Sequence, residues 1–275
     1  TISEAIEATA GFFLVAHDAT YEEVITIDTP GLTLESMNGA TVTIIDANGL
    51  TPAGVPATMH AAAVMITAEE VTFGGTDTGF TVKDAGVDVD AGGIGDDSTL
   101  WADDNSDGIA DVTGVYIWPN GGSIAVTDTE WLRISVIGNT IHGSQARGIR
   151  ADVAAGTYSE TVVSVYIAEN TVYDNLFHGF SGNALGDSGT TAVTTIIEDN
   201  EFRNNGPSGG TWTGYGEDED ASAWIDSGIE IQNGVGTDIV SILDNDIHDN
   251  FSAGIYLREI NAGMLVIEQN TINDN

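Results

Sequence analysis

The chain has 275 residues and a formal net charge of −37, from 43 acidic residues against six lysines and arginines. Its hydrophobic content of 41% is enough for a packed core, so it is not a disordered acidic tail. So few bases leave no surface for nucleic acid. The absence of cysteine excludes disulfides and thiolate metal sites. No apolar run reaches the ~20 residues of a membrane-spanning helix.

The acidic composition predicts a salt-loving source. Many carboxylates repel one another at low ionic strength, whereas 1 M salt shortens the screening length to about 3 Å. The alternative is a protein that is merely acidic. The chain begins at Thr1 without a signal-like segment, which predicts a processed chain or a fragment.

The first residues predict a short amphipathic helix that caps the fold. Residues 1–10 read "TISEAIEATA", with Thr1 and Glu4 spaced as a capping box. Such a helix would cover the first strand, which otherwise offers an open edge. The following segment, up to about Asp46, predicts short strands broken by turn residues.

One frame recurs through the second half of the chain. It has an asparagine at position zero, apolar residues at −3 and +2, and a second asparagine at +5, where Ser144 is the one exception. A glycine and an apolar residue then open the next strand, with earlier copies of that strand predicted at Gly79 and Gly114. The frame asparagines are Asn139, Asn170, Asn200, Asn245 and Asn270.

This frame alternates apolar and polar residues, which is strand rather than helix patterning. Short strands that turn every few residues and repeat at intervals of about 25 or more predict a coiled parallel sheet. Stacked coils would place the asparagines in a ladder, because each amide offers donors and an acceptor. The residue at +2 would point into the core.

The runs "ISEAIEATA", "ATYEEVITID" and "GLTLES", with coils such as "NTVYDN", resemble right-handed parallel β-helix proteins of the pectin-lyase-like superfamily. The resemblance implies an all-β fold: one right-handed parallel β-helix over residues 1–275 with a capping helix. A departure is Ala19, where the family usually has glycine. The superfamily includes lyases, hydrolases, esterases, epimerases, tailspikes, adhesins and proteins without known activity.

An acidic insertion, residues 84–113, predicts a calcium site. Oxygen ligands alternate along "DDNSDGIAD", with a glycine at the tight turn, as in calcium loops. Gly114 stands where an EF-hand has its bidentate glutamate, so the loop is not an EF-hand. The alternative is a solvated acidic loop. The predicted Ca²⁺ ligands are Asp103, Asn105, Asp107, the Ile109 carbonyl and Asp111.

The second and fourth residues after each glycine predict an outward polar face. Aromatic rings stack on sugars and arginine forks suit carboxylates, so the face is a candidate polysaccharide groove. The alternative is pairing between coils, for example Glu230 with Arg258. This set includes Thr81 and Lys83; its candidate binding residues are Tyr116, Trp118, Arg150, Asp152, Glu230, Tyr256 and Arg258.

A second insertion, residues 206–227, carries Trp212 and Trp224 around the acidic run "EDED". It is a further candidate for binding, since long loops on rigid scaffolds often carry function. The alternative is a loop that packs its own tryptophans. The histidines predict no metal site: His142 and His248 share an exposed column without fixed chemistry, and His178 has no partner at regular spacing.

These features predict an extracellular or cell-surface structural or adhesion module that binds polysaccharide. The alternative is a calcium-assisted polysaccharide lyase or epimerase acting on acidic glycans. No paired carboxylates mark a hydrolytic centre, and the Asp-Pro-His-Asp motif of related uronate epimerases is absent, so no catalytic residue is assigned. At Asn275 the last coil lacks a cap, which predicts that the chain continues or that another subunit stacks there.

Overall fold

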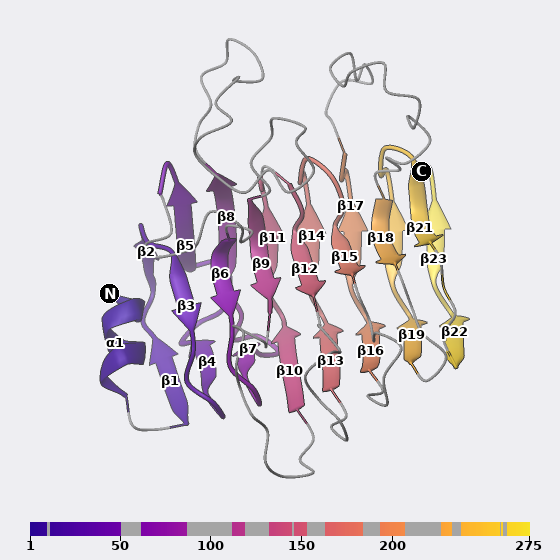
Figure 1. Cartoon of the computed structure of the whole chain (residues 1–275). Helices are drawn as coiled ribbons and strands as arrows, with labels where there is room; N and C mark the ends of the chain where they lie inside the picture. Colours follow the sequence, from indigo (N-terminus) through magenta and orange to yellow (C-terminus); the bar gives the residue numbers. More distant parts are fainter. Residues whose placement is uncertain are drawn as a thin grey trace, which may run out of the picture.

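The computed structural model shows three parallel sheets wound into one coil, with a short helix at the N-terminal end (Figure 1). It describes residues 1–9, 12–50, 62–86, 112–118, 132–144, 146–152, 163–183, 193–206, 227–232, 238–258, 260 and 263–275. The predicted right-handed parallel β-helix with its N-terminal helix is confirmed.

Helix α1 (Ile2–Ala8) begins one residue after Thr1 and is shorter than the predicted segment. The predicted capping box is present: the Thr1 hydroxyl accepts from the Glu4 backbone N–H at 3.1 Å, and the Glu4 carboxylate accepts from the Thr1 backbone nitrogen. Ile2 and Ile6 are buried against the first coil. The Glu23 carboxylate holds the helix start by accepting from the Ile2 N–H at 2.7 Å.

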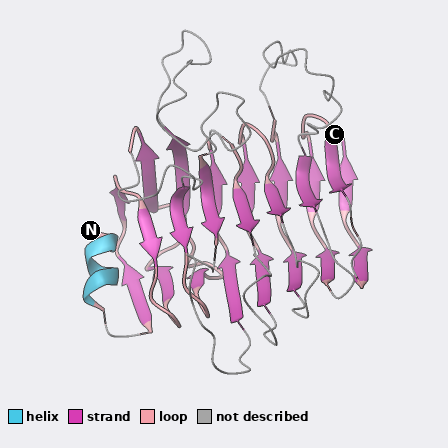
Figure 2. Cartoon of the chain, in the orientation of Figure 1, coloured by secondary structure: helices cyan, strands magenta, loops and turns pink. Residues whose placement is uncertain are grey.

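Each coil contributes one strand to each sheet, and the last coil contributes two strands (Figure 2). Sheet A contains β1 (Phe13–Ala16), β4 (Thr33–Ser36), β7 (Thr72–Gly74), β10 (Leu132–Ile137), β13 (Val163–Ala168), β16 (Val193–Glu198), β19 (Ile239–Leu243) and β22 (Met264–Glu268). Sheet B contains β2 (Ala19–Tyr21), β5 (Thr43–Asn48), β8 (Thr81–Gly86), β11 (Thr140–His142), β14 (Thr171–Tyr173), β17 (Glu201–Arg203), β20 (Asp246–His248) and β23 (Thr271–Asn273). Sheet C contains β3 (Ile25–Ile27), β6 (Ala62–Ile66), β9 (Thr113–Ile117), β12 (Ile149–Asp152), β15 (Phe180–Asn183), β18 (Ser227–Gln232) and β21 (Ala253–Arg258).

The predicted asparagine ladder forms the corner between sheets A and B. Each side-chain amide donates to the side-chain oxygen of the next coil, at 3.3, 3.0, 3.0 and 2.9 Å from Asn139 to Asn270. The residue before each asparagine has a positive φ, between 55° and 67°. A second ladder, at the end of sheet B, begins at Ser144 and continues through Asn175, Asn205, Asn250 and Asn275.

The predicted inward residues form the core of the coil. Ile141, Val172, Phe202 and Ile247 are completely buried. Ile272, in the last coil, is 47% exposed because β23 has a neighbour on one side only.

The assignment of Gly79 to the polar-face strand is wrong. Thr81 pairs with Thr140 and Lys83 pairs with His142, which places this segment in sheet B. The physical reason is close contact at the corner between sheets A and B, where a Cβ on Gly79 would lie 1.8 Å from the Gly138 carbonyl oxygen. A glycine followed by an apolar residue therefore marks either of two corners. The assignment of the Gly114 strand to sheet C is confirmed.

Candidate functional site

The outer side of sheet C brings the predicted polar residues into one column. Parallel pairing places Tyr116, Arg150, Ser181, Glu230 and Tyr256 side by side on successive coils. The side chain of Tyr116 lies outside the main core, in a small cluster with Ala62, Met65 and Trp118.

The burial of this column differs from the predicted open face. Tyr116, Arg150, Ser181 and Glu230 are each at most 5% exposed. The fourth residue after each glycine is more accessible: Trp118, Asp152 and Gln232 are half-buried and Arg258 is exposed. We call these four residues the outer edge of sheet C.

The Asp152 carboxylate is held by two donors from the buried column. The Tyr116 hydroxyl and the Arg150 Nε each donate to Asp152 Oδ2 at 2.8 Å. The Arg150 guanidinium also lies 5.7 Å from the centre of the Tyr116 ring. Asp152 Oδ1 has no hydrogen-bond partner among the residues that the structure describes. Trp118 stacks nearly parallel to Tyr116, with 6.5 Å between ring centres.

The Glu230 carboxylate is the centre of a second buried cluster. It accepts from the Ser181 hydroxyl at 2.8 Å and from the Gln232 side-chain amide. His178 Nε2 lies 3.1 Å from the same carboxylate. His178 Nδ1 accepts from the Ser227 backbone N–H at 3.2 Å, so the ring proton belongs on Nε2 and is donated to Glu230.

His178 is neutral at pH 7. Burial lowers its pKa to about 4, although the Glu230 charge acts in the opposite direction. Its contact with Glu230 is therefore a hydrogen bond between a neutral ring and a carboxylate rather than an ion pair.

Sequence reasoning missed His178 as a member of this site. Its partner Ser227 is 49 residues away, and a variable connection separates their coils. A signal was nevertheless present, because His178 and Ser227 each directly precede a corner glycine, Gly179 and Gly228. Residues at one offset from that glycine in consecutive coils become neighbours.

The remaining predicted residues are only partly placed. Tyr256 pairs in register with Glu230, whereas Arg258 pairs with Gln232. Trp212 and Trp224 lie outside the described residues, and so do the proposed calcium ligands Asp103, Asn105, Asp107, Ile109 and Asp111. Within the described part of the chain, no group of three or more His, Cys, Asp or Glu residues is placed to hold a metal ion.

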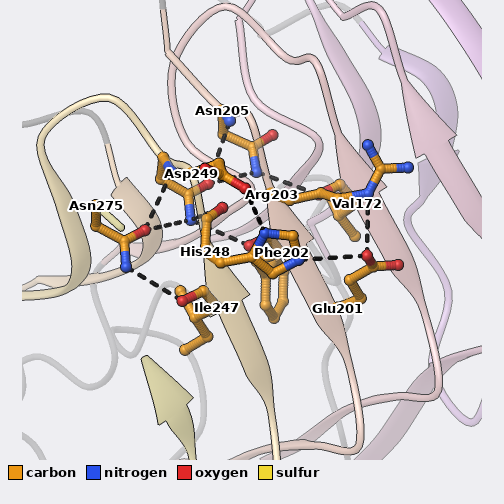
Figure 3. A network of polar contacts seen from close by, with 10 residues as sticks. Val172, Glu201, Phe202, Arg203, Asn205, Ile247, His248, Asp249 and Asn275 are labelled. Carbon is orange, nitrogen blue, oxygen red and sulfur yellow. Dashed lines mark hydrogen bonds and ion pairs between the residues drawn. The ribbon is translucent and has the colours of Figure 1, made fainter. Parts of the chain in front are cut away.

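The column on sheet B, predicted to be exposed and without fixed chemistry, is an ordered stack. His142 stacks on Tyr173 at 4.8 Å, and the Arg203 guanidinium lies 4.1 Å from the centre of the Tyr173 ring. Figure 3 shows how Arg203 Nε donates to Glu201 at 3.0 Å while His248 contacts Asp249 at 2.7 Å. The hydrogen bond to Asp249 is the main cause that raises the pKa of His248.

Comparison with known proteins supports the fold. The family model described as "right handed beta helix region" matches residues 113–275. The chain belongs to the right-handed β-helix family. No curated protein sequence matched this chain. In the described part of the chain, no helix is long and apolar enough to cross a membrane.

Two solved structures are similar to this β-helix protein. The enzymatically active domain of bacteriophage CBA120 tailspike protein 2 is 13% identical, with a TM-score of 0.42 over 99% of this chain and 40% of the tailspike chain. The chain thus spans about two fifths of the length of that structure. The A-module of the Azotobacter vinelandii mannuronan C-5 epimerase AlgE4 is 14% identical, with a TM-score of 0.29 over 98% of this chain and 91% of that module. At these TM-scores, neither structure informs the function of this chain.

Proposed function

We propose that this chain is a non-enzymatic β-helix module that acts outside the cell and binds polysaccharide with the outer edge of sheet C. The observation that carries the proposal is the fixed Asp152 carboxylate beside Trp118. Tyr116 and Arg150 hold Asp152 Oδ2 in place, and the Asp152 side chain keeps 16% of its surface exposed. A half-buried tryptophan next to an oriented carboxylate suits a sugar, because the ring covers its C–H face and the carboxylate accepts from its hydroxyls.

The buried column supports this edge. The Gln232 side chain donates to the buried Glu230 carboxylate, and the buried Tyr116 and Arg150 side chains donate to Asp152. Two residues of the outer edge of sheet C are therefore oriented by buried neighbours. Binding groups held in this way lose little conformational freedom when a ligand arrives. Tyr116, Arg150 and Glu230 therefore act as supports in this proposal and do not touch the sugar.

Burial also favours binding over catalysis. A lyase or epimerase would need an accessible base and an accessible group to neutralise a uronate carboxylate. Arg150 and Glu230 are 5% and 3% exposed, and both are bonded to protein groups. We therefore assign no reaction to them.

The test is a binding titration in constant molar NaCl with a panel of neutral and acidic polysaccharides. We expect Trp118→Ala to weaken binding roughly tenfold, as expected when an aromatic anchor is removed. The matched control is Tyr166→Ala, which removes a half-buried ring beneath an arginine on the outer face of sheet A and should leave affinity unchanged.

Two results would contradict the proposal. One is equal binding by the wild type and Trp118→Ala, and the other is the absence of binding to every polymer in the panel. A parallel incubation with uronate polymers, followed by the absorbance of unsaturated products, checks for lyase activity. If unsaturated product accumulates with time, the chain is a lyase that acts by β-elimination and the binding proposal is wrong.

A further inference from the structure

A groove lies on a different part of the surface, where sheet B passes into sheet C. Its volume of about 630 Å³ is within the usual range for small-ligand sites. It crosses four successive coils, from the end of β11 to the residues after β20. The described residues that line it include Asp174, Leu176, Asn204, Asp249 and Phe251.

The wall of the groove is built from fixed backbone. Asp174, Asn204 and Asp249 occupy the same position in consecutive coils, each with φ between 52° and 55°. Each is followed by an asparagine of the second ladder. Within that ladder the Asn175 amide donates to Asn205 at 2.9 Å, and the Asn205 amide donates to Asn250 at 3.0 Å. The three side chains at the groove are therefore presented at the regular coil spacing of about 4.8 Å.

The exposed groups combine hydrogen-bonding oxygens with an apolar ring. The side chains of Asp174, Asn204 and Asp249 are exposed, and Phe251 is 42% exposed. Carboxylates, amides and hydroxyls bond to sugar hydroxyls, while an aromatic face covers sugar C–H groups.

Charge decides which class of sugar fits. The described residues that line the groove include two carboxylates and no lysine or arginine, in a chain of net charge −37. A uronate or sulfated glycan would place its anions against Asp174 and Asp249, and like charges at close range are unfavourable. We propose that this groove binds a neutral oligosaccharide through Phe251, Asp174 and Asn204. This site goes beyond the proposed function, because it uses the edge of sheet B and none of the residues of the outer edge of sheet C.

The test is calorimetric titration with maltohexaose, mannohexaose and oligogalacturonate at one NaCl concentration. We expect at least one neutral hexasaccharide to bind and the oligogalacturonate to bind at least tenfold more weakly. Phe251→Ala should weaken neutral binding roughly tenfold. The matched control is Phe13→Ala, another exposed phenylalanine, which lies in β1 of the first coil. It should bind as the wild type does.

A second variant guards against misfolding. Asp174→Asn keeps a residue that tolerates the positive φ and removes one carboxylate, so it should fold and weaken neutral binding several-fold. Unchanged affinity in both Phe251→Ala and Asp174→Asn would overturn the proposal. Saturation by the oligogalacturonate alone would overturn it as well.

The two sugar sites fail independently in this design. Trp118→Ala should leave hexasaccharide binding in the groove unchanged. If Trp118→Ala abolishes all binding and Phe251→Ala has no effect, the groove proposal is wrong and the sheet C proposal stands. The reverse pattern overturns the sheet C proposal alone.

Discussion

The side-chain amide of Asn200 donates to the side-chain oxygen of Asn245 at 3.0 Å, although 45 residues separate them. The same amide also donates to the Ile167 and Glu198 carbonyls, and the Asn200 oxygen accepts from the backbone and side chain of Asn170. One buried side chain thus satisfies polar groups of three coils. The connections between coils can vary in length because the ladder keeps the coils in register.

Replacing Asn200 by alanine should destabilise the fold by about 3 kcal/mol, because each buried polar group left unsatisfied costs roughly 1–3 kcal/mol. The matched control is Asn270→Ala in the last coil, whose side chain is partly exposed and can bond to water. It should cost about 1 kcal/mol. Urea unfolding at constant NaCl measures the free energy of unfolding of both variants. Equal losses would contradict the prediction that Asn200 stabilises the fold through the buried ladder.

Stability should fall as the pH is lowered from about 6.5 to 4, because His178 stays neutral in the fold and becomes protonated in the unfolded chain. Burial lowers its folded pKa to about 4, so the unfolded state binds more protons over this range and the loss reaches about 3 kcal/mol. Urea unfolding at several pH values measures it. His178→Gln keeps a donor to Glu230 without the titration, and its pH dependence should be shallower. The same slope in both proteins would remove His178 as the cause.

Thermal stability should rise with salt and then level off. The net charge of −37 repels itself at low ionic strength, and added salt screens this repulsion. Melting temperatures in NaCl and in KCl, from about 0.05 to 2 M, measure the effect. Over this range of salt concentration the screening length falls well below about 10 Å. A melting temperature that does not change across this range would contradict the prediction of a salt-loving protein.

Calcium should stabilise the chain if residues 103–111 form the loop that the sequence predicts. Asp103, Asp107 and Asp111 place three negative charges within this short segment, and a cation would offset their repulsion. Without a bidentate glutamate, we expect a dissociation constant of about 10⁻⁴–10⁻³ M. Calcium titration at molar NaCl, followed by melting temperature, measures it. The control is Asp107→Ala, and identical responses of the two proteins would make the segment a plain acidic turn.

The sequence alone determined the coil and its ladders. The recurring offsets around Asn139 and its repeats predict the strands, the corner and the inward residue, because these features depend on neighbours within one coil. The capping box at Thr1 was equally readable, since its two partners are three residues apart. Local spacing was therefore sufficient for the fold class.

The tertiary structure decided which coils' residues meet and which are covered. Nothing local distinguishes the glycine of one corner from that of another, so Gly79 was placed in the wrong sheet. Contacts such as His178 with Glu230 arise from register between coils rather than from sequence distance. The burial of Tyr116 and Arg150 likewise depends on neighbours that only the folded chain provides, such as Met65 and Trp118 around Tyr116, because exposure is a property of the assembled molecule and not of strand alternation.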